Sequence, residues 1–527
     1  MMRRRFGLFL LIVSLCAWLI PAVSVSAEEG APAVTTDAQT AAKLGLLLGD
    51  GDGVTDSYLG KQSSRIQAVI ISLRLQGKLE EAKNFTGAAG FSDASVVSSS
   101  NQAILGYLKS HPELGWNGTG DGKFNPLAAI DSQQLYKVLL EVLGYKSGTD
   151  FTYAKTEEFA AGKGLSQIAG TAPITNAHIA TALVEALSAM TMQGHSLFEM
   201  LQGEGVIDAA AALPAGERIK LSSTDKLGTY FTDSKGRTLY YFTKDAADLT
   251  SCQGDCLKAW PIFYADDLQI PSSLNAADFG VLKRSDGTEQ TTYKGWPLYY
   301  FVKDQAAGDV LGEAVGGVWF VAKSDYAAMI GTSPKLGNYL TDEYGRTLYY
   351  FDKDTPQTSV CEGTCLVNWP AYLAAGDYVP TGVSKADIGT ITRSGGSKQT
   401  TYKGFPLYYF IKDKAHGDVL GQDVGNVWFV VNPGTFTGTT APIPKTYHVD
   451  IKEYSFGTGP LTVEAGSKVV FTNFDDMKHN AVAVDGSFST PLLSKGDSFT
   501  ITLNKAGTYD YFCEPHKKFM TGQIIVK

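Results

Sequence analysis

The stretch Asp510-Tyr-Phe-Cys-Glu-Pro-His-Lys-Lys-Phe-Met520 decides the fold at the end of this 527-residue chain. It carries a thiol, an imidazole and a thioether within eight residues, in the spacing Cys513-x2-His516-x3-Met520. The run Thr521-Gly-Gln-Ile-Ile-Val526 follows directly and reads as a closing strand. The three side chains therefore belong to a loop at the end of a sheet.

A second imidazole, His479, lies upstream, just after the strand-like run Lys468-Val-Val-Phe-Thr-Asn473. Two imidazoles and one thiolate in a plane, with a weak axial thioether, are the ligand set of a blue-copper site. The soft thiolate favours copper over magnesium, calcium or manganese, and the two imidazoles argue against a purely thiolate site. The alternative is a metal-free β-sandwich in which the buried cysteine is incidental.

Residues 446–527 resemble the cupredoxins, the plastocyanin, amicyanin and pseudoazurin family of small copper proteins. Besides the loop quoted above, the resemblance rests on the segments His448–Phe456, Val463–Val469, Asn473–Asn480 and Ala506–Cys513. It implies a C-terminal antiparallel β-sandwich, the cupredoxin fold, that holds one type 1 copper ion and carries out outer-sphere electron transfer.

The resemblance also implies roles for individual residues. The copper ligands would be His479, Cys513, His516 and Met520. The exposed edge of His516 would be the port through which electrons pass. Asn480 corresponds to the residue that steadies the loop of the first histidine from outside the ligand set.

Three lysines, Lys478, Lys517 and Lys518, place positive charge around this port, although the chain has a net charge of −9. Complementary charge steers association between redox proteins and makes its rate depend on salt. The sequence therefore predicts a redox partner protein with an acidic docking face. Lysines that are merely solvated are the alternative.

The histidine and cysteine content argues for an electron carrier rather than an enzyme. A trinuclear copper cluster needs eight further histidines, and the whole chain has seven. A binuclear site needs two cysteines in the loop, where only Cys513 stands. Two other functions remain open: a copper protein for storage, delivery or sensing, and a structural protein associated with the cell wall.

The middle of the chain contains two units, 216–323 and 325–431, that match at an offset of 109 residues. Aromatic and β-branched runs separated by turn residues predict antiparallel hairpins and an all-β tandem repeat. The block resembles secreted and lipoprotein repeats of unassigned function that carry a Tyr-x-aromatic-x2-Asp motif. Four copies occur, at Tyr240–Asp245, Tyr299–Asp304, Tyr349–Asp354 and Tyr408–Asp413.

Each unit carries one Cys-x3-Cys pair, Cys252/Cys256 and Cys361/Cys365. In an exported protein this spacing favours a local disulfide in each unit. A redox-active disulfide and a four-cysteine metal site are alternatives. Attached haem is excluded, because leucine and not histidine follows each second cysteine.

The region 37–212 is mainly α-helical by its pattern of apolar residues. It resembles S-layer homology modules, which occur in threes and hold proteins to cell-wall polymers. Three copies can be traced, at about 41–84, 101–145 and 155–190. The resemblance implies a cell-wall polymer as a partner, with a degenerate spacer bundle as the alternative.

The N-terminus reads as a signal peptide over residues 1–27, with a basic start, an apolar stretch and a small-residue cleavage site. No transmembrane span is expected in the mature chain, nor is binding to nucleic acid. These features predict a protein that is secreted or held at the cell envelope or cell surface. Residues 432–445, rich in Thr, Gly and Pro, predict an extended linker before the last domain.

Overall fold

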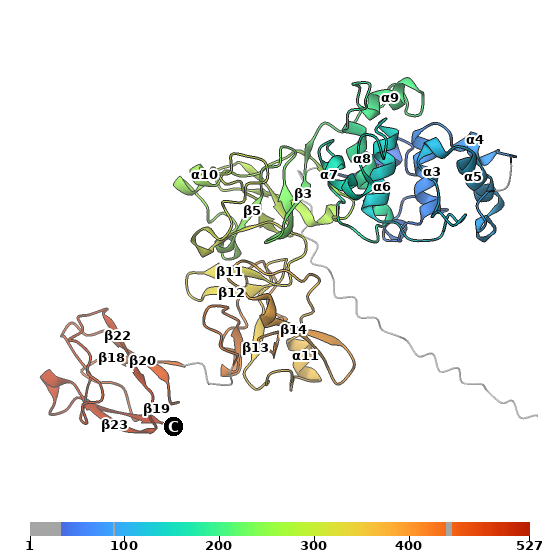
Figure 1. Ribbon diagram of the computed structural model, residues 1–527. Helices are drawn as coiled ribbons and strands as arrows, with labels where there is room; N and C mark the ends of the chain where they lie inside the picture. Colours follow the sequence, from blue (N-terminus) through green and yellow to red (C-terminus); the bar gives the residue numbers. More distant parts are fainter. Residues whose placement is uncertain (1–32, 88–89, 439–444) are drawn as a thin grey trace, which may run out of the picture.

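The computed structural model describes residues 33–87, 90–438 and 445–527 of the chain. The expected signal peptide, 1–27, lies outside the described residues. Residues 439–444 of the expected linker, 432–445, also lie outside them. Figure 1 shows a helical part, two β-rich units and a C-terminal β domain. No helix in the described ranges combines the length and apolar composition needed to cross a bilayer.

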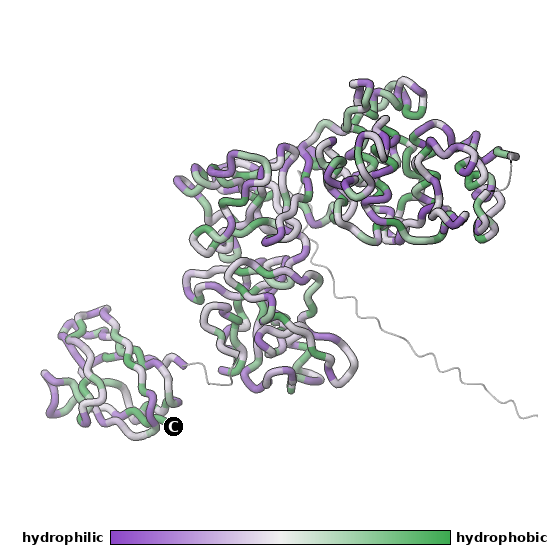
Figure 2. Tube along the Cα trace, in the orientation of Figure 1, coloured by the Kyte–Doolittle hydropathy of each residue, from purple (hydrophilic) through white to green (hydrophobic). Residues whose placement is uncertain are grey.

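The helical part is built from short amphipathic helices around one apolar core. Its α-helices are α1 Asp37–Lys43, α2 Asp56–Leu59, α3 Arg65–Leu75, α4 Leu79–Lys83, α5 Ser99–Ser110, α6 Ser132–Val142, α7 Thr156–Ala161, α8 Asn176–Ser188 and α9 Leu197–Gly203. Short 3₁₀ turns lie at Ala94–Val96, Pro112–Leu114 and Tyr153–Lys155. Figure 2 shows hydrophobic stretches along these helices, and their buried residues form one continuous cluster.

Three of these helices begin in the same way. Ser64, Asp131 and Thr175 are the N-caps of α3, α6 and α8, and in each case a side chain satisfies free backbone N–H groups at the helix start. The residues just before the caps form a closed ring of backbone hydrogen bonds. In this ring Ser63 N–H donates to Ile174 O (3.0 Å), Ile174 N–H to Ile130 O (2.9 Å), and Ile130 N–H to Ser63 O (3.2 Å). The ring gives the helical part an approximate threefold arrangement.

The helical part is joined to the first β unit by a shared sheet. Strand β1 (Ala33–Thr36) pairs in parallel with β6 (Asp267–Ile270), and β6 also pairs with β2 (Glu217–Arg218). Next to this sheet, the buried Asp37 carboxylate binds the Arg218 guanidinium at 2.7 Å. Strand β1 is not predicted from the sequence, because a four-residue strand that pairs with a distant segment carries no local signal.

The two β units share seven strands and one helical turn in the same order, and unit 1 contains two further strands, β2 and β6. Unit 1 contains β2, β3 Lys220–Thr224, β4 Gly228–Thr232, β5 Tyr240–Phe242, α10 Asp255–Ala259, β6, β7 Phe279–Lys283, β8 Glu289–Tyr293, β9 Trp296–Pro297 and β10 Trp319–Val321. Unit 2 contains β11 Met329–Ser333, β12 Gly337–Thr341, β13 Tyr349–Phe351, α11 Thr364–Asn368, β14 Ile388–Thr392, β15 Lys398–Tyr402, β16 Phe405–Pro406 and β17 Trp428–Val430.

The predicted hairpins form at β3/β4, β7/β8, β11/β12 and β14/β15. The predicted turn before the first Tyr-Tyr-Phe run closes an antiparallel bridge between Thr232 and Thr238, and the Leu239 amide donates to the Phe231 carbonyl at 2.9 Å. Strand β5 pairs with β10 and β13 pairs with β17, each partner lying far along the chain. The turns are therefore as predicted, whereas the pairing of the Tyr-Tyr-Phe strands over such a distance follows from tertiary packing, which local turn residues do not specify.

The repeated motifs within a unit are tied to each other reciprocally. In unit 1, Tyr240 donates a hydrogen bond to Asp304 (2.6 Å) and Tyr299 donates one to Asp245 (2.8 Å). The same two tyrosines exchange both backbone hydrogen bonds, at 2.8 and 2.9 Å. Each motif therefore supplies the tyrosine for the aspartate of the other, so two motif copies, and not one, make a folded unit.

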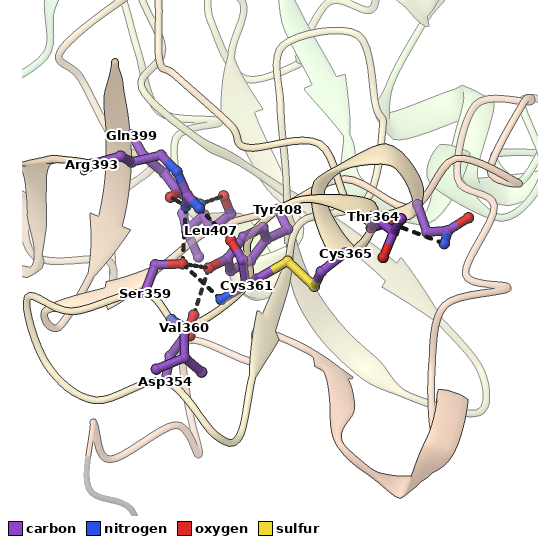
Figure 3. Close-up of a disulfide and its surroundings, with 11 residues drawn as sticks. Asp354, Ser359, Val360, Cys361, Thr364, Cys365, Arg393, Gln399, Leu407 and Tyr408 are labelled. Carbon is purple, nitrogen blue, oxygen red and sulfur yellow. Dashed lines mark hydrogen bonds between the residues drawn. A yellow bond between two sulfur atoms is a disulfide. The ribbon is translucent and has the colours of Figure 1, made fainter. Parts of the chain in front are cut away.

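The four cysteines form the local disulfides that the sequence favours, Cys252–Cys256 and Cys361–Cys365. Each bridge lies at the start of a single helical turn, α10 or α11. Figure 3 shows the second bridge with the groups around it: the Arg393 guanidinium donates to the Cys361 carbonyl and, at 2.9 Å, to the Ser359 hydroxyl. The bridge is thus bound into the network that contains the Tyr408–Asp354 pair.

The C-terminal domain is a sandwich of two sheets. Its strands are β18 Thr446–Ile451, β19 Leu461–Val463, β20 Ser467–Asn473, β21 Val482–Ala483, β22 Ser498–Leu503, β23 Gly507–Phe512 and β24 Thr521–Val526. The sheet orders are β18-β20-β22 and β19-β24-β23-β21. Two pairs, β18/β20 and β19/β24, are parallel, which corrects the expectation of a purely antiparallel sandwich. The reason is that the chain changes sheet between β18 and β20, so both strands run the same way.

A buried histidine lies where the two β units meet. His416 of unit 2 packs edge-on against Trp296 of unit 1, with ring centroids 4.4 Å apart, and neither ring nitrogen has a hydrogen-bond partner. Burial lowers the pKa of His416 to about 4, although the nearby Asp342 and Asp418 carboxylates oppose this shift. The position equivalent to His416 in unit 1 is Ala307.

We predict that His416 makes the contact between the units sensitive to acid. A folded-state pKa of about 4, below the ordinary 6.5, stabilises the fold at neutral pH. That stabilisation, about 3 kcal/mol when complete, is lost as pH falls from 6.5 toward 4. In His416→Ala, the free energy of unfolding should lose this part of its pH dependence, as measured by denaturant titration between pH 4 and 8. His111→Ala in the helical part is the control, and an unchanged pH slope in His416→Ala would contradict the prediction.

Candidate metal centre

Three donor side chains meet at one end of the sandwich. His479 follows β20, Cys513 follows β23, and His516 ends the 3₁₀ turn Glu514–His516. The Cys513 Sγ atom lies 3.5 Å from Nδ1 of His479 and 3.5 Å from Nδ1 of His516. All three donor atoms lie within 4.8 Å of one another, and within the described residues no other group of three or more His, Cys, Asp or Glu side chains converges in this way.

Backbone hydrogen bonds fold the loop 513–520 back on itself. The Cys513 amide donates to the Met520 carbonyl, the His516 amide to the Cys513 carbonyl, and the Met520 amide to the His516 carbonyl, each at 3.0 Å. Cys513 and Met520 are both buried and belong to the same apolar cluster. The loop therefore fixes where the thiol and the second imidazole lie, and Met520 is buried at the end of the same loop.

The electrostatics of the centre suit a cation. Burial raises the pKa of the Cys513 thiol, while the backbone N–H groups of Asn480 and His516 at its sulfur act in the opposite direction. Burial also lowers the pKa of His479 and so favours the neutral imidazole. Metal ligands are neutral imidazoles and thiolates, and a bound cation supplies the positive charge that a buried thiolate lacks. The donor set therefore fits a soft metal ion.

Asn480 joins the two loops that carry the donors. Its side-chain oxygen accepts a hydrogen bond from the Glu514 amide at 2.8 Å, and its own backbone N–H points at the Cys513 sulfur. The side chain is buried. These contacts are those of a residue that holds the His479 loop against the Cys513 loop.

Two residues that sequence analysis missed complete the surroundings of the imidazoles. The Asp475 carboxylate lies 3.1 Å from Nε2 of His479 and accepts hydrogen bonds from the amides of Glu453 (2.8 Å) and Tyr454 (2.9 Å). The Tyr454 ring stands edge-on to both imidazoles, at 5.2 Å from His479 and 5.1 Å from His516.

The turn that presents Tyr454 is strained. Glu453 and Tyr454 have φ values of 52° and 57°, a left-handed conformation that costs side-chain-bearing residues about 1 kcal/mol or more each. The two hydrogen bonds to Asp475 offset this cost. The turn is held by a carboxylate from another loop, Asp475, and not by residues next to it in the sequence. Neither Tyr454 nor Asp475 could therefore be predicted from local sequence.

Exposed apolar side chains and lysines occur on the turn and the two loops that carry Tyr454, His479 and the half-buried His516. The exposed fractions are 42% for Tyr454, 52% for Met477 and 66% for Phe519, whose ring centroid lies 5.7 Å from that of His516. Lys478, Lys517 and Lys518 are exposed around the same loops. The remaining predicted residues, the four disulfide cysteines, lie in the two β units and contribute nothing to this centre.

Comparison with known families matches two regions of the chain, the C-terminal domain and the middle region. Residues 445–527 match the family of copper binding proteins described as the plastocyanin/azurin family. Four stretches of the middle region, 222–263, 280–323, 332–372 and 389–432, match a secreted repeat of unknown function. Each stretch contains one Tyr-x-aromatic-x2-Asp copy, so the expected number of copies is confirmed.

Individual relatives match the C-terminal domain alone. The amicyanin of Paracoccus versutus is 37% identical over 84 residues, which make up 15% of this chain and 63% of the relative. Amicyanin-alpha of Methylorubrum extorquens is 34% identical over 92 residues, 16% of this chain and 76% of the relative. The solved structure of an oxidized amicyanin mutant is 34% identical and covers 15% of this chain and 81% of its own, with a TM-score of 0.15. The chain thus spans just under two thirds of the Paracoccus versutus relative.

We predict that Asp475→Ala releases the strained turn. Without the two hydrogen bonds that Asp475 accepts, the amides of Glu453 and Tyr454 lose their partners, and the domain should lose roughly 1–3 kcal/mol of stability. Hydrogen exchange at these two amides should become faster, and the contacts between Tyr454 and the imidazole protons should weaken in NMR spectra. Asp485→Ala, which removes a carboxylate that binds a local turn elsewhere in the domain, is the control. Unchanged exchange at residues 453 and 454 would contradict this account.

Proposed function

Because the chain belongs, through its C-terminal domain, to the plastocyanin/azurin family of copper-binding proteins, we propose that it is a type 1 copper protein that carries single electrons between partner proteins. The observation that carries the proposal is the meeting of one buried thiol and two imidazole nitrogens at one end of the sandwich. Its relatives are amicyanins and plastocyanins.

We assign the ligands to His479, Cys513, His516 and Met520. A copper ion held by such side chains supplies reversible one-electron chemistry. The protein's own part is to keep the donors fixed, with Asn480 and Asp475 holding the two histidine loops and backbone hydrogen bonds closing the loop 513–520. The apolar cluster beneath Cys513 and Met520 excludes water from the inner side of the centre. Rigid donors change little between oxidation states, which favours fast electron transfer over catalysis.

The surface around His516 suits a transient protein partner. An apolar patch of Tyr454 and Phe519 lies beside the half-buried imidazole, which is the ligand side chain that reaches the surface. Lysines around this patch favour a partner with an acidic face, and such charges act mainly on the association rate. A weak, short-lived complex is what an electron carrier requires.

The helical part supports a second proposal, attachment to the cell envelope. The closed ring of hydrogen bonds among Ser63, Ile130 and Ile174 places three equivalent helix starts around one axis. This is what three S-layer homology-like copies within 37–212 would produce. The Arg65 side chain, which begins the first of these helices, lies half-buried over the Phe124 ring at 4.8 Å. We propose that this part holds the exported protein to an anionic wall polymer.

We predict a reversible one-electron midpoint in a potentiometric titration of the copper-loaded full chain, with full recovery of the signal over repeated cycles. The electron-carrier role requires that copper remain bound in both oxidation states. A copper storage or delivery protein would instead lose the reduced metal to a competing chelator within the time of one cycle. That outcome would contradict the carrier function and leave copper binding intact, so the two functions are separated by one experiment.

We further predict that the lysines near His516 set the reaction rate with charged redox reagents. In Lys478→Glu/Lys517→Glu/Lys518→Glu, electron transfer with the hexacyanoferrate anion should slow about tenfold or more at low salt, and a cationic cobalt complex should react faster. The control is Lys468→Glu/Lys505→Glu/Lys527→Glu, with equal charge change at the opposite end of the sandwich. Equal effects of the two variants would show that only net charge matters.

A further inference from the structure

The β units contain stacks of aromatic rings that their core packing alone does not require. In unit 1 the order of the stack is Phe242, Trp319, Trp260, Phe301. Neighbouring ring centroids are 4.1, 3.8 and 4.3 Å apart, and the planes are inclined by 10°, 2° and 24°. Aromatic pairs usually prefer edge-to-face or offset contacts. Two tryptophans that are parallel to within 2° at 3.8 Å therefore form an unusual, face-to-face pair.

Unit 2 contains the same arrangement. Its stack runs Phe351, Trp428, Trp369, Phe410. The centroid distances are 4.3, 3.8 and 4.3 Å, and the tryptophan planes are inclined by 3°. We call each set of four rings a ring stack.

Each tryptophan of a ring stack also contacts a buried tyrosine edge-on. In unit 1, Tyr240 meets Trp260 at 5.5 Å and Tyr299 meets Trp319 at 5.1 Å. In unit 2, the corresponding pairs are Tyr349 with Trp369 at 5.4 Å and Tyr408 with Trp428 at 5.1 Å. The phenol groups are therefore one ring contact away from the stacked indoles.

Every one of these phenols donates a hydrogen bond to a carboxylate, and three of the four carboxylates are buried while that of Asp413 is half-buried. The Oη–Oδ2 distances are 2.6 Å for Tyr240–Asp304, 2.8 Å for Tyr299–Asp245, 2.7 Å for Tyr349–Asp413 and 2.6 Å for Tyr408–Asp354. Burying a carboxylate is costly. Here the buried carboxylate lies next to the hydroxyl oxygen of tyrosine, the atom that loses a proton when the ring is oxidised. Burial raises the pKa of all four carboxyls, to about 6 for Asp413 and well above the ordinary value for Asp245. The Asp413 carboxyl is therefore mostly ionised at neutral pH and can take that proton.

The stacked tryptophans are slightly more accessible to solvent than the tyrosines. The four tryptophans retain 4–5% exposure, while Tyr240, Tyr299, Tyr349 and Tyr408 are fully buried. A one-electron oxidant in solution therefore reaches an indole edge before it reaches a phenol. A radical that forms on the phenol is in turn shielded from solvent and from other molecules.

We propose that each ring stack, with its two Tyr–Asp pairs, is a redox relay that accepts oxidation by strong one-electron radical oxidants and stores it on a buried tyrosine. In the first step the oxidant takes one electron from a stacked tryptophan and is itself reduced. In the second step tyrosine gives one electron to the indole radical cation and its hydroxyl proton to the aspartate Oδ2. This restores neutral tryptophan and leaves a tyrosyl radical beside a carboxylic acid. In the last step a small reductant, a thiol or ascorbate, returns one electron, and the proton moves back from the carboxyl to the phenol.

The relay goes beyond electron transfer at the metal centre and does not depend on it. It gives the repeats a function of their own, the interception of radicals outside the cell. It also explains why the motif joins a tyrosine to an aspartate and why motif copies are used in pairs: each tyrosine finds its proton acceptor in the other copy.

The test uses the copper-free full chain and azide radicals made by pulse radiolysis, with tryptophan and tyrosyl radicals followed by their optical absorption. The relay predicts that the tryptophan signal converts to a tyrosyl signal at a rate independent of protein concentration. The variant with Tyr240, Tyr299, Tyr349 and Tyr408 all changed to Phe should lose most of this conversion. The double variant Asp354→Asn/Asp413→Asn should slow conversion in unit 2 by roughly tenfold or more, since the proton acceptors are weakened.

Two further variants keep the test decisive. Tyr136→Phe removes a buried phenol that donates to Glu185 at 3.0 Å in the helical part, away from the ring stacks. It should leave conversion unchanged. If the fourfold variant fails to fold by circular dichroism, Tyr349→Phe/Tyr408→Phe alone should remove about half of the conversion, because the two units are equivalent. A conversion that these changes leave unaltered, or that rises with protein concentration, would overturn the relay.

Discussion

The buried Cys513 thiol, held between two imidazole nitrogens 3.5 Å away, is the constraint around which the C-terminal domain is organised. A thiol sealed in an apolar cluster gains nothing from ionising unless a cation is bound. The fold therefore commits two loops, on different strands, to presenting donors at one point. Asn480 locks those loops together, and Asp475 stabilises both an imidazole and a strained turn.

In the rest of the chain, hydrogen bonds exchanged between repeated segments hold the structure together. In the β units, each Tyr–Asp hydrogen bond joins one motif copy to the other, so neither copy satisfies its buried polar groups alone. In the helical part, three helix starts exchange backbone hydrogen bonds in a ring. A shared sheet and the buried Asp37–Arg218 pair then bind the helical part to the first unit. Duplication of short motifs becomes a stable structure because the polar groups of one copy are satisfied by another.

The sequence predicted the metal-binding domain well because its chemistry is local. Cys513, His516 and Met520 occupy one loop, and their ligand types, together with His479 and the cupredoxin resemblance, predicted the site; copper as the cofactor is confirmed by the family match. What could not be predicted depends on distant contacts. Tyr454 and Asp475 meet the imidazoles only because a left-handed turn is held from another loop. Strand β1 pairs across more than two hundred residues, and the pairing of the Tyr-Tyr-Phe strands follows from packing. The S-layer homology-like character of 37–212 and the signal peptide stay predictions.

The central claim is that Cys513 binds copper as a thiolate together with the two histidines. The most direct measurement is the visible absorption spectrum of the full chain on addition of Cu(II), compared with that of Cys513→Ser, before and after dithionite. We expect an intense blue colour that bleaches on reduction, returns on reoxidation and is absent from the variant. A weak Cu(II) band that is the same in both proteins would contradict it.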